Sequence, residues 1–81
     1  MSVNIPTLDQ LQRGQRATVV GVAGADGIVQ RLLEMGLFAG EELEVIGFAP
    51  LGDPMEIRLR DYRLSLRRGE ASRISVKLSA D

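Results

Sequence analysis

Residues 55–67 read MEIRLRDYRLSLR, and this stretch decides the fold because its apolar residues alternate strictly with polar ones. Such alternation places every second side chain on the same face of a β-strand. Arg60 and Asp61 interrupt the pattern and predict a tight turn. The stretch therefore predicts a half-buried hairpin whose arginines face outward and whose inner face carries Met55, Ile57, Leu59, Tyr62, Leu64 and Leu66.

Three further strands are predicted around this hairpin. Residues 17–23 form a short, almost continuous apolar run that is typical of a strand covered on both faces. Residues 42–48 alternate with period two, and so do residues 73–78, in which Ile74, Val76 and Leu78 form the apolar set. Residues 50–54 contain two prolines and a glycine, which end the strand before the hairpin.

One short helix is predicted between the first two strands, over residues 28–35. Its apolar residues recur at helical spacing, and Asp26 is suited to the N-cap. Gly36 follows where a left-handed residue is favoured, and Leu37 is placed to fold back on Leu32 in a Schellman motif.

The order of these elements predicts a mainly β fold, a small barrel of about five strands with one inserted helix. Closure into a barrel is favoured because several short strands in a small chain would otherwise leave exposed edges. With 81 residues, the sequence predicts a single domain over 1–81 with its core at about 7–78.

The composition excludes several classes of function. The chain has no cysteine and no histidine, which removes disulfides, thiol nucleophiles, and the commonest general base and transition-metal ligand. No nucleophile–base pair can be assembled, so we expect no enzyme activity. We read no signal peptide and no apolar run of about 20 residues, which predicts a cytoplasmic protein.

Two motifs suggest a ligand, and both are better explained by structure. Gly21, Gly24 and Gly27 lack the Gly-Lys-Ser/Thr of a phosphate loop, so we predict a turn and no cofactor. Glu42 and Glu44 share a strand face, whereas Glu41 is expected to point elsewhere. A solvated strand edge is therefore favoured over a cation site, and a divalent metal bound there would be adventitious.

Charge is segregated along the chain. Residues 58–77 contain seven basic and two acidic residues, while the rest of the chain contains three basic and nine acidic ones. The basic hairpin has two interpretations of similar weight: a docking face for an acidic protein surface or for phosphate, or a solubilising face with glutamates of the neighbouring strand as counter-charges. The only aromatic residues are Phe38, Phe48 and Tyr62, which argues against a stacking platform for nucleic acid.

Two stretches together resemble the FeoA family of ferrous iron transport accessory proteins. The first is residues 31–37 followed by Gly40, which is similar to the family's helix-and-turn signature. The second is residues 49–55 followed by 64–68 and 70–71, which is similar to the loop-and-hairpin signature. The resemblance covers roughly residues 7–77, nearly the whole chain.

The resemblance implies an SH3-like barrel and a cytosolic accessory to FeoB, the membrane transporter of ferrous iron whose cytosolic part binds GTP. It implies contact with the membrane only through that partner. The shortage of stacking aromatics predicts no nucleic acid, and a chain without cysteine or histidine offers only hard oxygen ligands, so we expect no direct iron chemistry. We expect docking through the helix corner and the arginine-bearing hairpin, which supply Gly36, Leu37, Arg58, Arg60, Arg63, Arg67 and Arg68.

A second interpretation stays open. The same domain type is similar to the C-terminal module of iron-dependent repressors, which suggests a regulatory module that binds metal or nucleic acid. Such repressors carry a DNA reader upstream, for which this chain has no room, so the accessory role is favoured.

Overall fold

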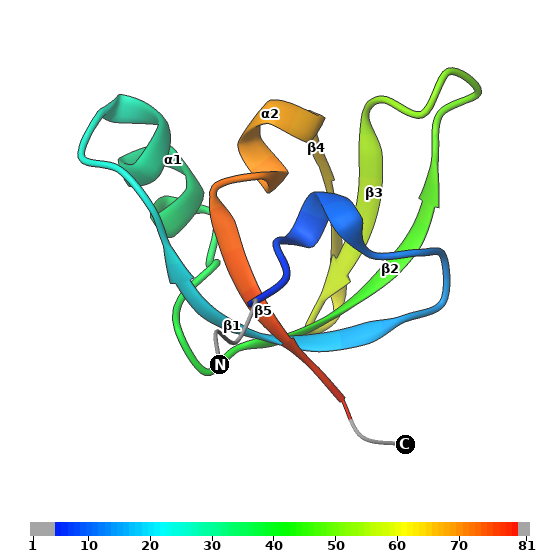
Figure 1. Ribbon diagram of the computed structural model, residues 1–81, viewed down its shortest axis with the longest axis horizontal. Coiled ribbons are helices and arrows are strands. Elements are labelled where there is room, and N and C mark those ends of the chain that lie inside the picture. Colours follow the sequence, from blue (N-terminus) through cyan, green and yellow to red (C-terminus); the bar gives the residue numbers. More distant parts are fainter. Residues whose placement is uncertain (1–4, 80–81) are drawn as a thin grey trace.

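The computed structural model describes residues 5–79 and contains five strands and three short helical segments in that range (Figure 1). In chain order they are the 3-10 helix η1 (Leu8–Gln10), β1 (Arg16–Val22), α1 (Gly27–Glu34), β2 (Glu42–Phe48), β3 (Met55–Leu59), β4 (Tyr62–Leu66), α2 (Arg68–Ala71) and β5 (Ile74–Leu78). The predicted helix between the first two strands is confirmed, as are all five strands, with bounds that differ by a residue or so.

The strands form one antiparallel sheet in the order β4-β3-β2-β1-β5. The sheet bends around the core as in a barrel, but β4 and β5 do not pair, so the predicted closure is incomplete (Figure 1). The N-terminal segment covers part of the β5 edge, because the amide of Val76 donates to the oxygen of Pro6 at 2.9 Å and Thr7 bridges to Ser75. The helix η1 packs against α2 and β5 on this side.

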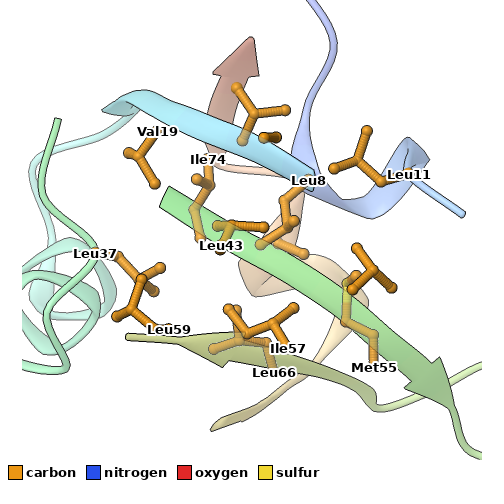
Figure 2. Close-up of a cluster of buried hydrophobic side chains, with 14 of the residues drawn as sticks. Leu8, Leu11, Val19, Leu37, Leu43, Met55, Ile57, Leu59, Leu66 and Ile74 are labelled. Atoms are coloured by element: carbon orange, nitrogen blue, oxygen red, sulfur yellow. The ribbon is translucent and has the colours of Figure 1, made fainter. Parts of the chain in front are cut away.

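The core lies inside the bend of the sheet, where leucine side chains of η1 and its flank meet those of the strands (Figure 2). Met55, Ile57 and Leu59 of β3 are fully buried, which confirms the inward face predicted from alternation. Tyr62 is an exception, because 40% of its surface is exposed. Tyr62 is the first residue of β4, and its hydroxyl donates a hydrogen bond to the backbone oxygen of Met35, the C-cap residue of α1.

The outer face of β1 corrects a second prediction. Ala17 and Val19 are buried, but Val20 is 47% exposed, so the strand is covered on one face only. The apolar run resembled a doubly covered strand because Thr18 and Gly21 on the outer face are small rather than charged. The side opposite the core carries no second layer of structure within residues 5–79 (Figure 1).

The two ends of α1 follow the sequence. Asp26 is the N-cap, and its carboxylate accepts a hydrogen bond from the amide of Val29 at 3.5 Å. The amide of Leu37 donates to the oxygen of Leu32 at 3.2 Å, and Gly36 donates to Leu33 at 3.0 Å with φ at +100°. These two bonds are the predicted Schellman motif.

Candidate docking surface

The five arginines predicted to dock are all exposed, but three of them have counter-charges. Arg58 and Arg63 lie opposite each other on β3 and β4, as the hairpin register requires. The guanidinium of Arg58 lies 3.7 Å from the carboxylate of Glu44 on β2, and that of Arg63 lies 3.7 Å from Glu56. At this length and exposure such pairs contribute little stability, yet they offset the repulsion between the two arginines.

Arg60 makes a closer pair at the turn between β3 and β4. Its Nε donates to Oε1 of Glu41 at 2.5 Å, which joins this turn to the segment before β2. The hydrogen bond from Arg60 holds the pKa of Glu41 below its ordinary value and raises the pKa of Arg60 itself. Arg60 and Glu41 therefore neutralise each other, and the structure supports the counter-charge interpretation at this end of the hairpin.

Arg67 and Arg68 lie at the other end of β4, where α2 begins. None of the ion pairs formed within residues 5–79 includes either side chain. The guanidinium of Arg68 lies over the ring of Phe48, 5.3 Å from its centroid, and its backbone amide donates to Asp53 at 3.0 Å. This cation–π contact and this hydrogen bond fix Arg68 beside the β2–β3 loop. These two arginines thus remain available to an acidic partner.

The predicted helix corner needs a correction. Leu37 is fully buried and packs in the core, because the Schellman turn folds it back under α1. Gly36 is half-buried against β4: a Cβ built on it would lie 2.5 Å from the hydroxyl oxygen of Tyr62. Both residues support the surface from within, and Phe38, which is 52% exposed, is the apolar side chain that this corner presents.

The structure divides the seven predicted residues between two ends of the hairpin. Gly36 lies near Leu59 and Tyr62, at the end that carries Arg60. Arg67 and Arg68 follow the far end of β4, about 13 Å away at the usual rise per strand residue. The predicted residues therefore lie at both ends of the hairpin, and Leu37 is the one that is fully buried; docking through the exposed members stays a prediction.

Sequence reasoning missed the β2–β3 loop as a surface feature. Leu51 at its tip is 97% exposed, the highest value among the large apolar residues in the described part of the chain. A leucine between Pro50 and Gly52, in a loop that needs no apolar side chain, was the available signal. The helix α2 was also missed, because four residues are too few to show a helical period.

Carboxylates and basic residues alternate across an open depression on the outer face of the sheet. Its lining includes Glu41, Glu42, Glu44, Arg16, Arg58, Arg60 and Lys77. Glu41 and Glu44 pair with arginines, and residues 5–79 contain no group of three or more Asp or Glu side chains placed to hold a metal. No helix among those residues is long and apolar enough to span a membrane.

Comparisons with known proteins identify the family. The sequence model of the FeoA domain matches residues 7–78. A Porphyromonas gingivalis protein named Fe(2+) transport protein A/Fe(2+) transporter FeoB fusion protein is 42% identical over 71 residues. That match covers 88% of this chain but only 8% of the relative, so the chain spans a small part of the fusion protein.

Solved structures agree with this match. An FeoA-like protein of Clostridium acetobutylicum has a TM-score of 0.89 at 31% identity. The alignment covers 99% of this chain and 93% of that protein's chain. The FeoA of Stenotrophomonas maltophilia, solved with zinc and called an SH3 domain protein, has a TM-score of 0.79 at 33% identity and covers 89% of both chains.

A manganese-dependent transcriptional repressor has a TM-score of 0.86 at 16% identity. The alignment covers 96% of this chain and 38% of the repressor chain. At that identity the likeness shows the fold alone, so the regulatory interpretation stays a prediction. The match over residues 7–78 and the structural likeness confirm the mainly β, SH3-like fold, and the chain belongs to the FeoA domain family.

Proposed function

We propose that this chain is a non-catalytic accessory protein of ferrous iron uptake that docks on the cytosolic part of the FeoB transporter. The observation that carries the proposal is the family match combined with the fusion relative, in which transport protein A and FeoB share one chain. Fusion holds two modules at high effective concentration, which is useful when the modules bind each other.

The distribution of charge supports docking by α2 and its neighbourhood. Arg67 and Arg68 are exposed, and neither takes part in the ion pairs of residues 5–79. Partner carboxylates would supply the missing counter-charges and would increase the rate of encounter. Arg58, Arg60 and Arg63 already have glutamate partners, so we assign them a smaller share of the contact.

The absence of histidine and cysteine from the sequence supports a role without iron chemistry of its own. Ferrous iron is then the cargo of the transporter, and this chain acts in the cytoplasm on the transporter. No catalytic residue and no resident cofactor is assigned.

Co-purification with the cognate full-length FeoB in detergent tests the proposal, with and without a guanine nucleotide. We expect the chain to elute with FeoB in at least one nucleotide state and to be retained less when Arg67→Glu is introduced. The matched control is Arg13→Glu, which reverses an exposed arginine in the turn before β1. Failure of the natural chain to elute with FeoB in every nucleotide state would contradict the proposal.

A further inference from the structure

The β2–β3 loop, residues 49–54, places a bare leucine on a projecting tip. In Figure 1 this loop extends at the upper right, on the opposite side of the molecule from α1. Leu51 at its tip is 97% exposed, whereas fifteen apolar residues of the described range 5–79 are buried in the core. Single exposed apolar side chains are common on protein surfaces, but at this exposure Leu51 makes almost no contact with the rest of the domain, so its whole side chain is accessible to a partner.

The loop is held in place by hydrogen bonds on both sides of Leu51. The amide of Ala49 donates to the oxygen of Pro54 at 2.9 Å and closes the base of the loop. The amide of Gly52 donates to the oxygen of Ala49 at 2.7 Å, with the φ of Gly52 at +88°. An anchor held in this way loses little conformational freedom when it binds.

The base of the loop is joined to the unpaired arginines. Asp53 accepts the hydrogen bond from the amide of Arg68, and the guanidinium of Arg68 covers Phe48 at the end of β2. Arg67 precedes Arg68 and is exposed. One end of the molecule therefore combines an apolar tip with two positive charges at its base, and we call Leu51, Arg67 and Arg68 the loop-end surface.

We propose that the loop-end surface is the docking site itself: Leu51 inserts into an apolar pocket on the cytosolic part of FeoB, and Arg67 and Arg68 contact carboxylates on the rim of that pocket. This inference rests on the proposed function and adds the contact surface and the chemistry of its partner. An aliphatic anchor in a pocket, surrounded by polar contacts, is the usual arrangement of a protein interface.

A protein pocket fits this surface better than a lipid surface does. Membrane insertion of a surface element uses several apolar or aromatic residues together with lysine or arginine on the same segment. The loop offers a single leucine, and its own charged residue is the acidic Asp53. The negative charge of Asp53 at the base of the loop would oppose contact of the tip with anionic lipid.

Titration of the cognate full-length FeoB in lipid nanodiscs tests the inference. The titrants are the natural chain, Leu51→Ser, and the control Ile5→Ser, which removes an aliphatic side chain of 56% exposure elsewhere on the surface. Loss of one buried leucine contact corresponds to a dissociation constant raised about 10-fold to 100-fold for Leu51→Ser. Ile5→Ser is expected to bind as the natural chain does, and Arg67→Glu to bind more weakly with a reduced dependence on salt.

Equal affinities of the natural chain and Leu51→Ser would overturn the inference and leave the proposed function standing. Equal weakening by Leu51→Ser and Ile5→Ser would also overturn it, because the effect would then not belong to the loop. Binding to empty nanodiscs that depends on Leu51 would assign the tip to lipid instead. No binding of the natural chain to FeoB would overturn the proposed function and this inference with it.

Discussion

The hydroxyl of Tyr62 in β4 donates a hydrogen bond of 2.7 Å to the backbone oxygen of Met35, the C-terminal cap residue of α1. The last carbonyls of a helix have no partner within the helix, so this bond satisfies one of them and fastens α1 to the sheet. Arg31 of α1 pairs with Glu70 of α2, and Asp26 pairs with Arg73 at 2.7 Å. Polar contacts thus connect both ends of the inserted helix to distant parts of the chain.

Removal of the Tyr62 hydroxyl tests this fastening. We expect Tyr62→Phe to lower the free energy of unfolding by about 0.5–1.5 kcal/mol, the usual net contribution of one hydrogen bond, and nearer the lower figure because the residue is partly exposed. Urea unfolding followed by circular dichroism measures the change. Unaltered stability would mean that the bond does not form in solution.

Gly36 beside the same hydroxyl predicts a larger effect. Gly36→Ala adds a Cβ that meets the Tyr62 oxygen at 2.5 Å and also forces alanine into a φ of +100°. We expect a loss of about 1–3 kcal/mol in urea unfolding, because left-handed backbone is costly for residues with a Cβ.

The double variant Gly36→Ala/Tyr62→Phe separates the two causes. Deleting the oxygen relieves the close contact but leaves the backbone strain. The double variant is therefore expected to lose less unfolding free energy than the sum of the losses in the two single variants. Strict additivity would show that the Cβ and the hydroxyl do not interact.

The packing of α1 on the core rests on Leu32, which is fully buried. Leu32→Ala is expected to cost about 2–5 kcal/mol, a large part of the stability of so small a domain. The half-buried Val29 on the same helix supplies the control, since Val29→Ala removes less buried surface. Similar midpoints of thermal unfolding for the two variants would contradict the assigned packing.

Two ion pairs predict a dependence of stability on pH. Arg73 lowers the pKa of Asp26 below its ordinary 3.8, and Arg60 lowers the pKa of Glu41 below its ordinary 4.5. A folded pKa below the unfolded one gives stability that is present above the ordinary value and is lost as pH falls through the folded value. Thermal midpoints measured from pH 7 to pH 3 are expected to fall less in Asp26→Asn/Glu41→Gln than in the natural chain.

The contribution of the two ion pairs to the pH dependence of stability is expected to be small, because both pairs are at the surface and are screened by salt. Added salt should therefore reduce the difference between the natural chain and the double variant in how far the thermal midpoint falls from pH 7 to pH 3. If the thermal midpoint fell further in the double variant than in the natural chain, the two ion pairs would not have the stabilising effect assigned to them.

The alternation of residues 55–67 was sufficient to predict the hairpin and the outward direction of its arginines, because strand geometry fixes which face each side chain takes. The register, with Arg58 opposite Arg63, came from the structure. The Schellman turn at Gly36 was also predictable, because this motif depends only on residues close together in the sequence. The exposure of Tyr62 was not predictable, because it depends on a hydrogen bond to Met35, 27 residues away. The helices α2 and η1 were too short for any periodic signal.

The candidate site divides in the same way. Exposure of the arginines followed from the strand pattern, whereas the identity of their counter-charges depended on which strands are neighbours in the sheet. The Arg60–Glu41 pair joins residues 19 positions apart, and only the assembled fold brings them together. Burial of Leu37 was implied by the predicted Schellman contact with Leu32. A side chain buried in the core in this way is not accessible to a docking partner.

Uptake of radiolabelled ferrous iron by cells that lack this chain, complemented by the natural chain or by Arg67→Glu/Arg68→Glu, tests the central claim most directly. We predict that uptake falls without the chain, returns with the natural chain, and stays low with the double variant although that variant is folded and present at a normal level. Normal uptake of ferrous iron in cells without the chain would contradict the claim that it is an accessory of this transport.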